Sequence, residues 1–406
     1  EIKARRAGDP ATLVASSEKA RRVLGRLPEH ITVKCSGNII KNVKAVIVPT
    51  TGDMKGIETS AVLGAVGGNP DKKLEVLVDV TEEDLALTRE LLKKKICSVE
   101  LIEGVSSLQI IVEMTAGDES SLVEIAFSHT NIVRIEHNGE QIFKKGLSVQ
   151  NATETDRSLL NLKDIYTFAT TVNLEDVADL MERQVDCNLK IAREGLSNKY
   201  GANVGSTILE HYGDDVRNRA RALPAAGSDA RMNGCVLPVM INSGSGNQGM
   251  TVSIPVAEYA KAMSADQDTL HRALLLSNLT AIYLKSGIGK LSAYCGAVGA
   301  AVGAGAAITW LRGGDYAAIS RTVTNALADV SGIVCDGAKA SCAAKIASAL
   351  DAALLAGSMA ERKQTFAPGE GLVADSVDQT IQNISRLGRD GMRTTDVEIL
   401  NIMIGQ

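Results

Sequence analysis

Three cysteines in the C-terminal third of the sequence have the residue type and the surroundings for iron–sulfur chemistry. Cys295 lies in residues 292–297, and Cys335 and Cys342 lie in residues 332–342, all among small side chains. Three thiolates can hold a cubane cluster and leave one iron open to a substrate, so that this iron acts as a Lewis acid. The alternative is three inert cysteines in a protein core, which is common.

The spacing of these cysteines predicts how the chain positions them. Cys335 and Cys342 are seven residues apart, and on one continuous helix this separates their Cα atoms by roughly 10 Å. A cluster needs them closer together, so we expect the helix to begin after Cys335, with Asp336 and Gly337 as the break. The amide groups at that helix start would favour thiolates and an anionic cluster.

A glycine-rich segment over residues 243–249, Ser-Gly-Ser-Gly-Asn-Gln-Gly, matches the dinucleotide fingerprint G-x-G-x-x-G. That interpretation is poorly supported, because Pro255 and helical patterns follow where a second strand should stand. Such a loop can instead close over a small substrate with its backbone N–H groups, or be a flexible connection. We predict that Ser243 and Asn247 bind substrate.

Polar residues follow several expected strands in the N-terminal part. Ser36, Asn38 and Lys41 follow the first of them. A second group, which we expect to end another strand, comprises His129, Thr130 and Asn131. All are predicted to hold the carboxylate and amine of a small amino acid, with His129 also a catalytic candidate. Each group alone is more often turn chemistry, and a lone histidine is more often structural.

The composition excludes several classes of function. The chain has 406 residues and a net charge of −5, with no basic run and only 3% aromatic residues, so we expect no nucleic-acid partner. Its seven cysteines are too scattered for a disulfide framework. Residues 1–22 are charged and lack an apolar core, unlike a secretory signal. We therefore expect a cytoplasmic protein in a reducing compartment.

One uncharged segment, residues 291–311, approaches the length of a membrane span and contains four glycines. Alanine and glycine dominate it over leucine, and no second span accompanies it. We therefore predict a central buried helix and no membrane partner. A homodimer is one assembly compatible with the sequence.

The patterns along the chain predict an α+β fold with two domains. Strands and helices mix over residues 1–158, whereas residues 159–406 show long helical periods. Helices are expected over 10–24, 59–66 and 82–95, and strands over 31–35, 43–48, 74–80, 98–102, 108–114, 121–128 and 131–137. The Asn138-Gly139 pair predicts a hairpin turn after the last of these strands. The expected helices of the second domain are 159–170, 174–194, 204–212, 257–264, 268–285, 293–311, 315–329, 338–356 and 376–387.

Taken together, these segments resemble the L-cysteine desulfidase family, which is related to iron–sulfur L-serine dehydratases. The resemblance is carried by residues 36–42, 48–52, 61–68, 129–133, 194–197, 228–249, 334–338 and 394–396, and by Cys187, Cys295 and Cys342. It covers nearly the whole chain. It implies an α/β part followed by a helical part shared with serine dehydratases, an oxygen-sensitive 4Fe–4S cluster that can be lost in air, and conversion of L-cysteine to pyruvate, ammonia and sulfide.

One position departs from the pattern of this family. Its members usually carry Gly-Cys-Thr-Glu-Pro at the start of the first helix, and that cysteine is thought to lie at the active site. Here residues 6–10 read Arg-Ala-Gly-Asp-Pro. Asp9 is the nearest substitute for proton transfer, but the start of a helix stabilises its carboxylate form and weakens it as a base.

The sequence thus predicts an enzyme that eliminates a β-substituent from a small amino acid, with Cys295, Cys335 and Cys342 holding the cluster. L-cysteine is the first candidate substrate, and an activity like that of L-serine dehydratase is the second. Two other classes stay open: a cluster-free relative that binds an amino acid or carboxylate without turnover, and a dinucleotide-dependent enzyme.

Overall fold

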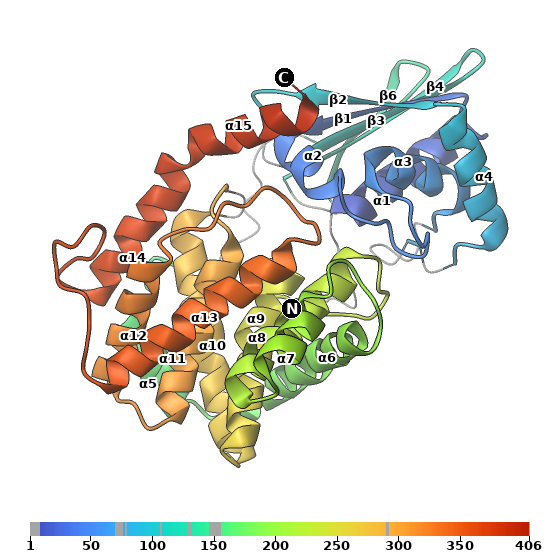
Figure 1. The fold of residues 1–406 in the computed structure, drawn as a ribbon. Helices are drawn as coiled ribbons and strands as arrows, with labels where there is room; N and C mark the ends of the chain where they lie inside the picture. The colour runs from blue at the N-terminus through green and yellow to red at the C-terminus, as the bar shows by residue number, and fades with distance from the viewer. Residues whose placement is uncertain are drawn as a thin grey trace.

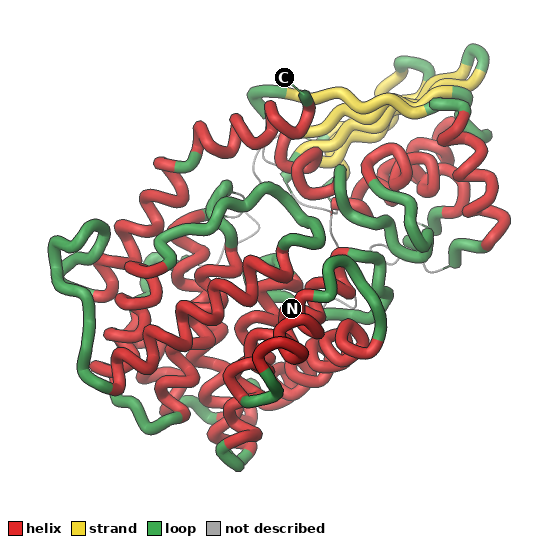
Figure 2. The backbone as a smooth tube through the Cα atoms, in the orientation of Figure 1, coloured by secondary structure: helices red, strands yellow, loops and turns green. Residues whose placement is uncertain are grey.

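The computed structural model describes residues 9–69, 76–77, 79–105, 108–127, 131–145, 156–289 and 292–405. Strands gather in the N-terminal part, and the rest of the described chain is helical (Figures 1 and 2). The expected α+β fold class is confirmed. The domain boundary at residue 158 stays a prediction.

A six-stranded mixed sheet forms the first layer, in the order β2-β1-β3-β4-β5-β6. Its strands are β1 (His30–Ser36), β2 (Cys97–Ile102), β3 (Gln109–Ala116), β4 (Glu119–Ala126), β5 (Ile132–His137) and β6 (Glu140–Lys144). Only the β1–β2 pair is parallel, and the other pairs are antiparallel. Burial alternates along β1 and β3, as expected for strands with one face on a core.

Three helices lie on one side of this sheet (Figure 1): α1 (Asp9–Leu24), α3 (Gly56–Gly67) and α4 (Glu82–Lys93). Helix α4 begins with a capping box between Thr81 and Asp84. The expected Asn138-Gly139 turn joins β5 and β6, with φ values of 51° and 78° that fit a tight hairpin.

The chain does not form the expected strand over residues 43–48. It continues from β1 into a short helix, α2 (Gly37–Val43), and then into a loop with one isolated bridge between Ile47 and Lys55. Val43, Val46 and Val48 of this run are nevertheless buried, so its apolar residues pack in the core from a helix end and a loop. The expected strand over residues 74–80 lies partly outside the described residues, and its described positions are not strand.

The helical part surrounds one apolar helix, α11 (Gly296–Leu311), which packs against four others. Its neighbours are α9 (Gly246–Ala262), α10 (Gln267–Ile288), α12 (Tyr316–Asp329) and α13 (Cys342–Glu361). The remaining helices are α5 (Leu162–Thr171), α6 (Ala178–Ser197), α7 (Val204–Tyr212), α8 (Val216–Met232) and α14 (Val377–Arg386). Residues 297–309 of α11 are all buried, so the predicted central helix is confirmed.

Small residues let these helices approach closely. A Cβ at Gly303 would overlap the backbone carbonyl oxygen of Ser277 on α10, so only glycine fits there. Among the described helices, α13 alone has the length and apolar composition of a membrane span, and 56% of its apolar window is buried inside the fold.

Two helices differ from the sequence-based expectation in this part. Helix α8 was not expected, and α9 is longer than expected because it continues through Pro255. A proline inside a helix removes one backbone hydrogen bond, but both helices are buried over most of their length, so packing outweighs that loss.

A last helix, α15 (Arg393–Ile404), returns from the helical part to the sheet (Figure 1). Asp396 forms an ion pair with Lys41 of α2, and Leu400 packs against Gly37. The π-helical turn η3 (Leu387–Gly391) joins α15 to α14. Helix α15, which the sequence did not predict, therefore connects the two parts of the fold next to α2.

Candidate active site

All three predicted cysteines line one pocket of about 140 Å³. Its walls come from α2, from the starts of α9, α11 and α13, and from the end of α10. The lining residues are Lys41, Asn42, Ser243, Gly244, Ser245, Asn247, Gln248, Lys285, Ser292, Tyr294, Cys295, Gly296, Ala297, Cys335, Gly337, Ala338, Cys342 and Ile346. The pocket is smaller than those of drug-sized ligands, which take roughly 300 Å³ or more, so it suits a small molecule.

A two-stranded contact brings Cys295 and Cys335 together. Tyr294 and Val334 form an isolated antiparallel bridge, in which the N–H of Cys295 donates to Ile333 and the N–H of Cys335 donates to Ala293. The gap of forty positions between the two cysteines is therefore closed by backbone hydrogen bonds. The two thiols are also hydrogen-bonded to each other.

The third cysteine is placed as its spacing predicted. Helix α13 begins at Cys342, so Cys335 lies in the loop before the helix and not on it. Gly337 makes the break, with a φ of +98° that side chains rarely adopt. A Cβ at this position would also overlap the carbonyl oxygen of Lys41, so the loop packs directly on α2.

Gly337→Ala should therefore destabilise the fold more than backbone strain alone would. Gly289 is a matched control, because its φ is +97° and no atom of the described residues lies within 4 Å of an added Cβ. We expect Gly289→Ala to lower the unfolding free energy by about 1–2 kcal/mol through backbone strain alone. Gly337→Ala should lower it by the same strain and by about 1–3 kcal/mol more, because its Cβ overlaps the carbonyl oxygen of Lys41. Urea unfolding of both variants measures the difference, and equal losses would contradict the packing of this loop on α2.

Each thiol accepts a backbone hydrogen bond, from Ala297 to Cys295, from Gly337 to Cys335, and from Lys339 to Cys342. Amide donors to sulfur favour the thiolate form that binds metals. These amide groups are free to donate to sulfur because of where they lie: Ala297 is in the first turn of α11, and Gly337 and Lys339 precede α13.

The thiols differ in their protonation. The hydrogen bond from Cys295 is the largest effect that lowers the pKa of Cys335 to about 5, and burial opposes it. The amide of Gly337 and the charges of Lys41 and Lys345 add to the lowering. The same thiol–thiol bond, with burial, raises the pKa of Cys295 well above its ordinary value. Cys335 therefore carries the negative charge of this pair.

Cys335 should react with iodoacetamide in the iron-free protein at about pH 6, where an ordinary cysteine is less than ~1% thiolate. Because its pKa is lowered, the thiolate is present above about pH 5, and reactivity disappears as the pH falls through that value. Peptide mapping after a short exposure identifies the labelled residue. Labelling of Cys187 as fast as of Cys335 would contradict this assignment.

Three lysines lie near the thiols, and two of them, Lys41 and Lys285, line the pocket. Lys41 is buried and pairs with Asp396, and Lys345 pairs with Asp336. Lys285 is also buried, yet its ammonium group forms no hydrogen bond or ion pair with any described residue. Burial lowers the pKa of Lys285, and the charges of Cys335 and Cys295 oppose that lowering.

The chemistry of the donors fits an anionic group bound through thiolates. Among the described residues, no three His, Cys, Asp or Glu side chains are close enough to hold a single metal ion. A cubane cluster has a different requirement, since each of its thiolates binds a different iron. Cys295, Cys335 and Cys342 are the residues that would hold it.

Among the predicted substrate-binding residues, Lys41, Ser243 and Asn247 line this pocket. Arg231 of α8 donates a 2.9 Å hydrogen bond to Asn247. No parallel sheet surrounds Gly244, because the loop leads into α9 and the described strands all lie before residue 145. The dinucleotide-binding fold is therefore absent from this segment.

The other predicted residues are not among those that line the pocket. Ser36 accepts a 3.2 Å hydrogen bond from the amide of Gln109, Asn38 lies on α2, and Asn131 donates to Ala126 in a turn. Asp9 is the first residue of α1, and its side chain lies outside the described part. His129 and Thr130 also lie outside the described residues.

Several residues that line the pocket were not predicted from the sequence, above all Lys285, Gln248 and Tyr294. The hydroxyl group of Tyr294 is buried without a hydrogen-bond partner among the described residues. Gln248 belongs to the glycine-rich segment, so its position in that segment could have predicted a place in the pocket. Lys285 gave no such signal, because a lysine near a helix end is usually exposed.

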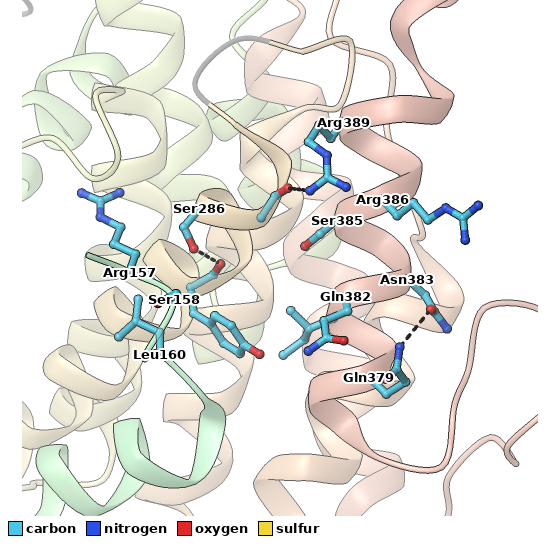
Figure 3. Close-up of a pocket in the computed structure, with 13 residues that line it drawn as sticks. Arg157, Ser158, Leu160, Ser286, Gln379, Gln382, Asn383, Ser385, Arg386 and Arg389 are labelled. Carbon is cyan, nitrogen blue, oxygen red and sulfur yellow. Dashed lines mark hydrogen bonds between the residues drawn. The ribbon is translucent and has the colours of Figure 1, made fainter. Parts of the chain in front are cut away.

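A larger pocket of about 550 Å³ lies between α10 and α14, and Figure 3 shows its side chains. None of the three cysteines lines it. Its arginines do not converge: Arg157 and Arg386 lie on opposite sides, and Arg389 bonds to the carbonyl of Gly287 and to Asp390 (Figure 3). The smaller pocket with the thiols is therefore the candidate active site.

Comparison with known proteins places this architecture in a family. Residues 71–401 match the serine dehydratase alpha chain family, which is most of the sequence. The chain belongs to that family. It is also 53% identical to a UPF0597 protein of Lachnoclostridium phytofermentans over 98% of this chain and 95% of the relative. Similar proteins of Desulfitobacterium hafniense and Treponema denticola are 48% and 46% identical, over 98% of this chain and 93% and 94% of theirs.

Family membership suggests a lyase-like role. The names of these three relatives state no activity, so the leaving group and the substrate are not given by the comparison. The match includes Cys295, Cys335 and Cys342, and it begins after α2 and Lys41.

Proposed function

We propose that this protein is an iron–sulfur lyase that eliminates the β-substituent of a small amino acid, with L-cysteine as its main substrate. The observation that carries the proposal is the set of three thiols on one small pocket, each with a backbone amide donor. When bound, a 4Fe–4S cluster with one open iron supplies a Lewis acid for the departing sulfur or hydroxyl group.

The chain's own residues account for binding and charge. The lysines on the pocket wall, Lys41 and Lys285, attract the carboxylate of the amino acid, and the small volume of the pocket excludes larger ligands. Lys41 and Lys345 stabilise the thiolate of Cys335 through their charges. Ser243 and Asn247 stand at the start of α9, where amide groups without helical acceptors favour an anion.

The reaction removes the proton on Cα and breaks the bond between Cβ and the leaving group. L-cysteine would give hydrogen sulfide and aminoacrylate, which reacts with water to give pyruvate and ammonia. Removal of a weakly acidic Cα proton requires a base held against the bound substrate. Asp9 remains the sequence-based candidate for that base.

L-serine is the second candidate substrate, because the matching family is that of the serine dehydratase alpha chain. Serine would lose water in place of hydrogen sulfide and give the same pyruvate and ammonia. An assay with both amino acids decides which leaving group the enzyme uses.

The test is an anaerobic assay of iron-reconstituted and iron-free protein with L-cysteine and L-serine, in which pyruvate is measured. We expect pyruvate only with the reconstituted protein, and sulfide with it when L-cysteine is supplied. Pyruvate formed equally without iron would refute the cluster's role. Amino-acid binding without pyruvate under either condition would favour a binding protein without turnover.

A further inference from the structure

Lys285 is the residue of the pocket whose role the proposed function leaves unexplained. It is only 9% exposed and lies in the last turn of α10. The side chain lines the pocket and has no hydrogen-bond or ion-pair partner among the described residues. Because the residue is nine-tenths buried, little water can surround its charge, and an anion in the pocket would stabilise it.

The other lysines nearby have protein partners. Lys41 pairs with Asp396, and both Lys339 and Lys345 pair with Asp336. Lys285 differs from these three lysines, because no described carboxylate forms an ion pair with it.

The thiols do not take that place. Each sulfur already accepts a backbone amide, and the lysines that lower the pKa of Cys335 most are Lys41 and Lys345. Cys295 and Cys335 act on Lys285 through charge, without a hydrogen bond to its ammonium group. An anion that enters the pocket can therefore form the direct contact with this ammonium group that the thiols do not form.

Two helix starts lie on the same pocket and favour the same charge. A Cβ at Gly296 would come within 2.5 Å of the Gln248 side chain, so the first turns of α11 and α9 are in contact. The amide groups of a first helical turn have no acceptor within the helix and bind anions readily.

We propose that Lys285 binds the carboxylate of the amino-acid substrate, with the first-turn amides of α9 as the second half of that site. The inference rests on the proposed function and deepens it, because it assigns the end of the substrate that does not react. A carboxylate fixed at Lys285 turns the rest of a small amino acid toward the three thiols, which share its pocket.

The first test measures binding of L-alanine, which has the carboxylate and amine but no leaving group, by calorimetry. It uses iron-free and iron-reconstituted protein. Lys285→Met should weaken L-alanine binding about 10- to 100-fold, as loss of a hydrogen-bonded charge does. Iron content should stay unchanged, and Lys190→Met on the surface of α6 should bind as the wild type does.

The second test uses only the wild-type protein, so it does not depend on how a variant folds. L-alaninamide replaces the carboxylate by a neutral amide, and it should bind at least about 10-fold more weakly than L-alanine. Equal binding of the two would overturn the assignment.

The remaining outcomes also decide the matter. Loss of iron from Lys285→Met would mean that Lys285 balances the thiolates, and the proposal would fail. A wild-type protein that binds no L-alanine would overturn it as well. If L-alanine binds through Lys285 but no reconstituted sample forms pyruvate, the proposed reaction fails and the carboxylate site stands.

Discussion

Cys335→Ala should lose most of the iron that the wild-type protein takes up on anaerobic reconstitution, which we expect to be about four atoms per chain. The substitution removes the thiolate with the lowered pKa and leaves Cys295 without its hydrogen-bond partner. Changing a residue beside a metal ligand already lowers metal affinity or activity roughly 10- to 100-fold. Removal of the ligand itself should therefore lower pyruvate formation at least about 100-fold. Iron analysis and the pyruvate assay on one sample measure both effects.

Cys187→Ala is the matched control for this experiment. Cys187 is also a partly buried free cysteine, but it lies on α6 and does not line the pocket. It should keep its iron and its activity. If Cys335→Ala retains as much iron as Cys187→Ala, the three thiols do not form the ligand set.

Introducing a cysteine at position 7 or 8 should raise sulfide release from L-cysteine. The family resemblance puts a cysteine near this position, where the present chain reads Arg-Ala-Gly-Asp-Pro. A missing general base typically costs 10²- to 10⁴-fold, so Ala7→Cys or Gly8→Cys should recover part of about that range. Sulfide release by each variant at equal iron content measures the gain.

Asp9→Asn tests the alternative within the same series. If Asp9 has taken over the proton transfer, this variant should lose activity in the wild-type background and tolerate the change better beside an introduced cysteine. Fast wild-type turnover of L-cysteine that survives Asp9→Asn would show that the base lies elsewhere.

The strongest sequence-based predictions were those with a geometric reason. The distance along a helix between Cys335 and Cys342 required a break, and α13 indeed begins at Cys342. Alternation of apolar and polar residues marked most of the strands, and the Asn138-Gly139 pair marked the β5–β6 turn. These features depend on a few neighbouring residues, so a single sequence contains them.

Other features depended on contacts distant in sequence. The apolar run around Val43 fits a strand or a buried helix turn equally well, and only packing on the sheet decides between them. The expected helix began at residue 257, after Pro255, whereas α9 continues through this proline because it is buried among its neighbours. Lys285 resembles a surface lysine until α10 places it against the thiols.

The candidate site was partly predictable for the same reason. Cysteines in small-residue surroundings, together with the glycine-rich loop, named Ser243, Asn247 and the three thiols of the pocket. Polar residues at strand ends were a poorer guide: Ser36 bonds to the neighbouring backbone, and Asn131 stabilises a turn. Such residues serve turns as often as ligands, and their sequence context is the same in both cases.

Mössbauer spectroscopy of the anaerobically reconstituted protein, recorded before and after addition of L-cysteine, tests the central claim most directly. Three thiolates leave one iron of a cubane cluster open, so one of about four irons should change its spectrum when substrate binds. The other irons should stay as they were. A protein that assembles no cluster, or a cluster whose irons are all unaffected by L-cysteine, would contradict the proposed active site.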